Sequence, residues 1–303
     1  MSTPSPVMTD LPLTRSRALG NLRIHILEAG LQRLDGGAMF GVVPRPLWER
    51  RIAPDARNRI PLALRCLLVE TPDALVLIDT GAGNKESEKF VEIYGIENEG
   101  APTRLEDAIR AAGFEPGDVS VVVDTHLHFD HAGGNTVREA ADGDERAVVR
   151  PAFPGAKYVV QKGEWEFAHR DNERIRASYL PHNFDPIHDA GLFEFVEGET
   201  EIVPGIQVEV TPGHTPWHQS VLVRSGGETA CFLADLVPTT AHLPLAWIMG
   251  YDVEPLVTLE SKRALLRRAR DEEWLLIFEH DPVVPWARLD PKEGRPTLLP
   301  PSP

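Results

Sequence analysis

The stretch that decides the fold and chemistry of this chain is VVVDTHLHFDHAGGN, residues 121–135. It begins with valines, which favour a buried strand, and its polar side chains include His126, His128, Asp130 and His131. One histidine on an apolar face is more often a hydrogen-bonded core residue than a ligand. Clustered polar groups without partners would each cost roughly 1–3 kcal/mol, however, and imidazole and carboxylate groups bind zinc and its first-row neighbours. The stretch therefore predicts a metal site.

Three more polar residues follow predicted strands in the same way. His214 comes after IQVEV, Asp235 after CFLA and His280 after LLIF. Residues at the ends of separate strands can converge on one rim of a sheet, where loops carry function on a rigid scaffold. We therefore predict that these side chains join the cluster around His126.

Short apolar runs rich in Val, Ile, Leu and Phe predict the strands. The runs lie within residues 21–30, 63–70, 74–83, 119–126, 156–161, 206–214, 219–226, 229–236 and 274–281. Residues 1–18 are rich in Ser, Thr and Pro, and residues 291–303 are rich in Pro. We expect a flexible N-terminal segment and a C-terminal tail outside the packed body, and one domain over residues 19–290.

Helices are fewer than strands. Thr103 and Glu106 form a capping-box pattern at the start of TRLEDAIRAAGF, which predicts a helix that stops at Gly113. A second helix is predicted over residues 258–271, and residues 163–180 favour a third.

The composition is that of an ordinary folded protein. Of 303 residues, 42% are hydrophobic and 25% are charged, unlike a disordered chain. The formal net charge of -15 serves solubility and disfavours phosphate backbones and anionic lipids, so we expect no nucleic acid and no membrane as partners. Cys66 and Cys231 lie in separate apolar runs, which predicts buried free thiols. Without an apolar leader or a membrane-length run, the sequence indicates a soluble, cytoplasmic protein.

The order HLHFDH, TPGHTPWH, LADL and FEHDP resembles the metallo-β-lactamase superfamily, whose signature HxHxDH is followed by a lone His, an Asp and a final His. The early LIDTGAG around Asp79 also resembles the first strand motif of that family. The resemblance runs from about residue 20 to residue 285. It implies an α+β (α/β) protein with a four-layer αββα sandwich and a metal cleft at one edge of its two sheets.

The resemblance also implies a role for each ligand. It gives His126, His128 and His214 to a first metal, Asp130, His131 and His280 to a second, and Asp235 to both as a bridge. Asp79 would orient a ligand loop. Such ligands suit two Zn²⁺ ions per chain, or Mn, Fe or Co, about 3.5–4 Å apart. The shared water would ionise near neutral pH and attack an ester or lactone carbonyl, with Asp130 and Asp235 expected to be essential for catalysis.

Within the superfamily, THLHFDHAGGN looks most like the quorum-quenching N-acyl homoserine lactonases, with the methyl parathion hydrolase-like organophosphatases close behind. Those lactonases carry a tyrosine three residues after the bridging Asp, where this chain has Pro238. Tyr251, His218 and His242 are candidate replacements as donors to the substrate.

Alternative functions come from other members of the same fold. A glyoxalase II-like thioesterase shares HxHxDH, and an organophosphate triesterase remains a second alternative. The negative charge disfavours a nuclease, and a flavodiiron protein would be expected to have Glu in place of His128. A non-enzymatic metal-binding protein would be expected to lack ligands, whereas all seven are present.

Several apolar residues near the ligands could form a substrate pocket. They are Phe40, Trp48, Phe129, Trp217 and Tyr251. Core packing explains such residues by default, but an apolar loop beside a metal site could line a pocket. We therefore expect a small hydrophobic ester or lactone substrate, and the resemblance suggests a homodimer.

Overall fold

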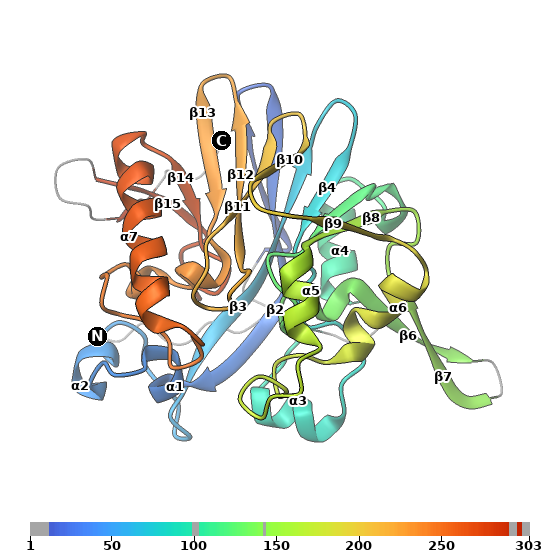
Figure 1. Ribbon diagram of the computed structural model, residues 1–303, viewed down its shortest axis with the longest axis horizontal. Coiled ribbons are helices and arrows are strands. Elements are labelled where there is room, and N and C mark those ends of the chain that lie inside the picture. Colours follow the sequence, from blue (N-terminus) through green and yellow to red (C-terminus); the bar gives the residue numbers. More distant parts are fainter. Residues whose placement is uncertain (1–11, 99–102, 142–143, 291–295, 299–303) are drawn as a thin grey trace.

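The computed structural model describes residues 12–98, 103–141, 144–290 and 296–298, and in these residues two sheets lie face to face (Figure 1). The first sheet contains, in spatial order, β1 (Thr14–Leu19), β2 (Leu22–Asp35), β3 (Arg59–Glu70), β4 (Leu75–Ile78), β5 (Val121–Val123), β8 (Lys157–Gln161) and β9 (Phe193–Val196). The second contains β10 (Thr200–Val203), β11 (Ile206–Val210), β12 (Gln219–Ser225), β13 (Glu228–Phe232), β14 (Leu275–Ile277), β15 (Trp286–Leu289) and β16 (Pro296–Leu298). A separate hairpin pairs β6 (Thr136–Ala141) with β7 (Asp144–Pro151) and projects from one side of the molecule (Figure 1).

The main core lies between the two sheets. Side chains alternate along β2, so that Ile26 packs in this core while its neighbour Leu27 packs on the opposite face. The inner cluster also includes Val221 and Phe232 of the second sheet. Because both faces of β3 are covered, all but its two end residues are buried, which explains its nearly continuous apolar sequence.

Helices cover the two outer faces. On the first sheet, α4 (Arg104–Ala111) contributes Leu105 and Ile109 to an outer cluster, and on the second, α7 (Pro255–Asp271) contributes Leu265. The shorter helices are α1 (Gly36–Phe40), α2 (Arg45–Trp48), α3 (Glu88–Tyr94), α5 (Lys162–Ala168) and α6 (Asp185–Asp189). The predicted four-layer αββα sandwich is thereby confirmed.

The predicted helices differ from the observed ones mainly at their ends. The capping box of α4 is confirmed, with the Thr103 N–H donating to Glu106 Oε2 at 2.6 Å. Helix α7 begins at Pro255, because proline is well suited to the first turn. The helix expected over residues 163–180 is only partly present: α5 ends at Ala168, and Asn172 Oδ1 accepts from the Arg174 N–H in a turn that a helix cannot contain.

Both ends of the described chain hold strands where the sequence suggested unpacked segments. β1 pairs with β2 along residues 14–19, so the expected boundary at residue 18 falls inside a paired strand. β16 pairs with β15 inside the expected tail, whose other residues lie outside the described ones, as do residues 1–11. Edge strands this short carry too little apolar pattern to be recognised. Cys66 and Cys231 are buried free thiols, as predicted, and no described helix has the length and apolarity to cross a membrane.

Candidate metal centre

The strand order brings the predicted ligands to one rim of the sandwich. β4 and β5 run parallel, so Asp79, directly after β4, lies beside the segment that leads from β5 to His126. β13 and β14 also run parallel, which places Asp235 and His280 beyond neighbouring strand ends. His214 follows β11 in the same sheet.

The turn that carries four of the ligands is held by close backbone packing. The Thr80 N–H donates to His131 O at 2.7 Å, and buried Lys85 donates to Gly133 O and Thr136 O. A Cβ atom on Gly133 would collide with the backbone of Ala82, so only glycine permits this approach. The AGGN end of the opening stretch is therefore a structural requirement of the ligand turn.

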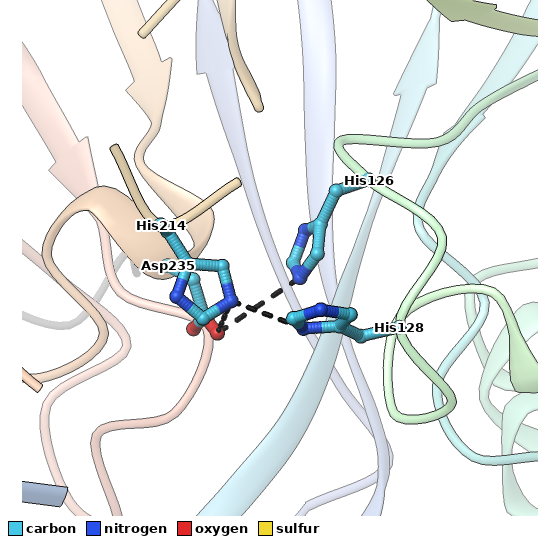
Figure 2. A group of neighbouring side chains, drawn as sticks. All are labelled: His126, His128, His214 and Asp235. Carbon is cyan, nitrogen blue, oxygen red and sulfur yellow. Dashed lines mark hydrogen bonds and ion pairs between the residues drawn. The ribbon is translucent and has the colours of Figure 1, made fainter. Parts of the chain in front are cut away.

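His126, His128, His214 and Asp235 form the first ligand group (Figure 2). His214 Nε2 lies 3.0 Å from Asp235 Oδ2 and 3.1 Å from His128 Nδ1. His126 Nε2 lies 4.0 Å from Asp235 Oδ2. All four side chains are buried and point at one another, His126 and His128 from the same turn and His214 and Asp235 from two other segments, as Figure 2 shows.

Asp130, His131 and His280 form the second ligand group. His280 Nε2 lies 3.2 Å from His131 Nε2 and 3.8 Å from Asp130 Oδ2. Asp235 stands between the groups, since its Oδ1 is 3.2 Å from His280 Nε2 while its Oδ2 faces His214. The seven predicted ligands thus lie in two adjacent groups, with Asp235 between them.

These residues fit a pair of metal ions. His126 Nε2 is buried and has no hydrogen-bond partner, an arrangement that costs free energy unless a cation binds there. Two pairs of ring nitrogens also lie close together, His128 Nδ1 with His214 Nε2 and His131 Nε2 with His280 Nε2. The two nitrogens of a pair cannot both donate to each other, but both could bind the same metal ion. Imidazole and carboxylate ligands of this number suit zinc or a neighbouring transition metal.

In the first group, burial favours the metal-binding form of two rings. Burial, assisted by neighbouring histidines, holds the pKa of His126 and His128 well below the usual value, so both rings are neutral. His214 differs, because its Nδ1 donates to Asp252 Oδ1 at 2.9 Å. Burial lowers its pKa, but Asp235 and Asp252 together outweigh burial and raise the pKa to about 10.

In the second group, carboxylates stand behind the rings. His131 Nδ1 lies 3.0 Å from Asp79 Oδ2 and 3.1 Å from Glu279 Oε2, which leaves Nε2 free for an ion. His280 Nδ1 donates to Ala63 O at 2.7 Å. Against the effect of burial, Asp235 and Glu279 raise the pKa of His280 to about 9, and Glu279 and Asp130 raise that of His131.

Glu164 is a supporting residue that sequence reasoning missed. From α5 it accepts from the Leu127 N–H at 3.1 Å, from the Tyr179 hydroxyl at 2.7 Å and from the Thr215 hydroxyl at 2.7 Å. It thereby joins the turn of His128 to the loop of His214. The available signal was a glutamate next to the aromatic residue Trp165 in KGEWEFA, but an amphipathic helix explains that pattern equally well.

A cavity of about 190 Å³ opens onto the ligands. Its apolar wall comprises Leu34, Met39, Leu62, Phe129, Ile175, Met249 and Val253. The structure also places Tyr251 on the wall, together with Tyr94 of α3, which sequence reasoning did not single out. Ligand residues His128, Asp130, Asp235 and His280 form its floor.

Three residues expected in the pocket lie elsewhere. Phe40 and Trp48 are buried beneath it, stacked on each other with ring centroids 5.3 Å apart, and neighbouring Met39 takes the wall position. Trp217 lies over Gly163 and is 40% exposed, outside the cavity. These three aromatic side chains therefore pack against other parts of the protein and do not border the cavity.

Two of the three candidate donors are also excluded from the cavity wall. Both ring nitrogens of His242 are occupied, by Thr239 Oγ1 and Met39 O, each at 2.8 Å. His218 is buried against Thr211 and does not line the cavity. The O atom of Pro238 accepts from the His280 N–H at 3.0 Å, so this residue supports a ligand instead of offering a donor.

Comparisons with known proteins agree with this geometry. The family model described as metallo-beta-lactamase superfamily matches residues 60–280. An N-acyl homoserine lactonase of Bacillus thuringiensis is 30% identical over 232 residues, which cover 73% of this chain and 82% of the lactonase. The N-acyl homoserine lactonase AttM of Rhizobium radiobacter is 31% identical over 189 residues, covering 60% of this chain and 65% of AttM.

Solved structures show the same architecture. A Staphylococcus aureus protein described as a probable metal-dependent hydrolase has a TM-score of 0.84 and 30% identity, over 93% of this chain and 99% of the other. AidC, a dizinc quorum-quenching lactonase, has a TM-score of 0.73 and 22% identity, over 96% of this chain and 98% of its own. At that identity the likeness to AidC concerns the fold alone.

Proposed function

The chain belongs to the metallo-beta-lactamase superfamily and is a metal-dependent hydrolase, and from this premise we propose that it opens a hydrophobic lactone or carboxylic ester at a dinuclear centre. The observation that carries the proposal is one cavity whose floor is formed by ligand residues and whose wall is mostly apolar. The lactonases among its relatives at 30% identity support the same bond type. We propose zinc as the metal, because the donors are imidazole and carboxylate groups.

The ligand side chains would hold the ions and prepare the site. Two ions of the zinc type, when bound, would supply Lewis acidity to a carbonyl oxygen and acidify a water molecule. Asp235 would fix their separation by offering one oxygen to each group. Asp79 would hold the His131 ring in the orientation that turns its Nε2 inward.

The cavity wall would position the substrate. Its apolar residues exclude water, which strengthens every electrostatic interaction at the floor. The phenols of Tyr94 and Tyr251 line the same cavity. Burial is the main cause that raises the pKa of each phenol, and the negative charge of Asp130 adds to it. Both phenols therefore stay protonated at neutral pH, and either can donate a hydrogen bond to a substrate oxygen.

An acyl-homoserine lactone is a first substrate to test. Pro238 stands three residues after Asp235, where the lactonases carry a tyrosine, so any donor to the substrate must come from another residue of this chain. One panel separates the reaction types: a γ-lactone series with and without N-acyl groups, p-nitrophenyl esters, paraoxon-type phosphotriesters and S-lactoylglutathione. Each is compared by kcat/KM with added zinc, manganese or cobalt. We expect the highest values for lactones or carboxylic esters, and a clear preference for phosphotriesters or the thioester would replace the proposal.

A further inference from the structure

One charged side chain on the cavity wall is not explained by the reaction. Arg174, in the loop after α5, lines the cavity and is largely exposed, so it lies where the cavity opens to solvent. No other arginine or lysine is among the cavity-lining residues that the structure describes. The guanidinium therefore gives the mouth of an apolar cavity a positive charge.

The position of Arg174 is fixed from both ends. Its N–H donates to Asn172 Oδ1 at 2.9 Å, and the next residue, Ile175, is buried in a hydrophobic cluster. At the other end, its Nη2 donates to Gly250 O, directly before Tyr251. The side chain thus spans two loops that border the cavity, and little conformational entropy remains to be lost when it binds a ligand.

The charge of Arg174 has no carboxylate partner among residues 12–98, 103–141, 144–290 and 296–298. This is so although Asp171 and Glu173 are close in sequence, and other surface arginines such as Arg110 and Arg268 do pair with carboxylates. Arginine has five N–H donors, and one neutral carbonyl uses only one of them. The remaining donors suit the two oxygens of a carboxylate.

We propose that Arg174 determines specificity, by favouring substrates that carry a carboxylate at the end remote from the bond that is cleaved. The metal centre would hold the scissile carbonyl, apolar wall residues such as Ile175 and Met249 would contact a short methylene chain, and Arg174 would bind the terminal carboxylate. This inference rests on the proposed ester or lactone hydrolysis. It adds to that proposal a substrate class, an acyl or ring chain that ends in an anion.

A matched pair of esters tests the inference on the metal-loaded protein. The p-nitrophenyl ester of hexanoic acid and the mono-p-nitrophenyl ester of adipic acid have similar chains and differ in the terminal carboxylate. The wild type should have a kcat/KM about tenfold higher for the adipate ester than for the hexanoate ester, mainly because of a lower KM. A factor of this size is what one exposed, charge-assisted hydrogen bond contributes. Arg174→Met should abolish that preference, because kcat/KM should fall much more for the adipate ester than for the hexanoate ester. Added salt should weaken the preference of the wild type.

Arg176→Met is the control, because Arg176 is exposed, belongs to the same loop and does not line the cavity. It should keep the preference. An equal loss of both esters in Arg174→Met would overturn the inference, because it would show that Arg174 only holds its loop against Gly250. So would a wild type that treats both esters alike, or that prefers the neutral amide of the adipate ester.

A binding measurement separates this inference from the proposed hydrolysis. Adipate and hexanoate are not hydrolysed, and each can place one carboxylate at the metal centre. Calorimetry on the zinc-loaded protein should give adipate a lower Kd than hexanoate in the wild type and in Arg176→Met, but not in Arg174→Met. If this result were obtained without turnover of any ester, it would contradict the proposed function but support the carboxylate-binding site. Equal Kd values for adipate and hexanoate in the wild type would contradict the inference.

Discussion

The two ligand groups of the metal centre differ in what lies behind their rings. In the first group, His126 Nδ1 lies 3.1 Å from the hydroxyl oxygen of Thr125, and burial is the main reason why the ring is neutral. In the second, His131 has two carboxylates behind a single ring nitrogen, Asp79 and Glu279. The first group therefore has two rings that burial keeps neutral and one, His214, that a carboxylate supports. In the second group two carboxylates stand behind the single ring of His131.

This difference shows how one fold can give two adjacent ion sites different affinities for metal ions and for protons. Carboxylates behind a ring increase its basicity and its attraction for a cation, but they also increase its affinity for protons. A buried neutral ring has less electrostatic attraction for an ion but needs no deprotonation. We therefore expect the two ions to differ in their dependence on outer carboxylates and on pH.

The largest effect should come from the residue that the groups share. Asp235→Asn removes the negative charge of a carboxylate whose two oxygens face the two groups, so both sites should weaken and kcat on the best substrate should fall by about 100-fold or more. Metal content and kcat measured together check this. Full activity with two ions bound would show that Asp235 is not the link between the groups.

The next effect should separate the groups. Asp79→Asn should weaken the second ion by about 10- to 100-fold and leave the first nearly unchanged, because Asp79 contacts His131. Asp252→Asn should do the reverse, through His214. Dissociation constants from competition with a chelating dye distinguish the ions, and equal weakening of both by each variant would contradict the comparison.

The candidate ligands could be proposed from the sequence, but most of the residues behind them could not. All seven follow strand ends or lie in one short turn, so local pattern and the family resemblance together singled out side chains that the structure brings close to one another. Asp252 lies in unremarkable loop sequence and meets a ring 38 residues away. Glu279 directly precedes His280, but its carboxylate faces His131 instead. Which loop carboxylate reaches which ring depends on the path of the backbone, which local pattern does not specify.

The pocket shows the same limit on a smaller scale. Met39 and Phe40 are neighbours in α1, and only Met39 lines the cavity while Phe40 packs beneath it. An apolar sequence indicates burial without indicating which side chain borders a cavity. The strand β1 was missed because TRSRAL is mostly polar and pairs along one edge only.

The pH dependence of metal binding should sharpen the comparison further. In the second group, His131 and His280 both have raised pKa values, so an ion must displace a proton from each ring. In the first group only His214 has a raised pKa, so an ion must displace one proton. Affinity should therefore fall as pH falls below about 9, by about one power of ten per pH unit for each displaced proton. The fall should be steeper at the second group.

Variants that retain one group allow this measurement. His126→Ala with His128→Ala leaves the second group, and Asp130→Ala with His131→Ala leaves the first. Kd values between pH 6 and pH 9 should give a steeper slope for the second group, with ions bound less tightly in acid. Parallel slopes would mean that charge does not distinguish the two groups.

The smallest effect should come from Glu164→Gln. Glu164 acts on the backbone and a hydroxyl beside the ligands, so the first ion should weaken by less than about tenfold, and the free energy of unfolding should fall by about 1–3 kcal/mol. Glu166→Gln, on the exposed side of the same helix, is the matched control and should change neither. If both variants behave alike, Glu164 does not join the ligand segments.

The central claim is that seven side chains form two adjacent ion sites, and the metal content of purified protein after zinc loading and desalting tests it most directly. We predict two zinc ions per chain in the wild type, and one in each of the two double variants that lack a ligand group. A wild type without metal, or two ions in all three proteins, would contradict the account.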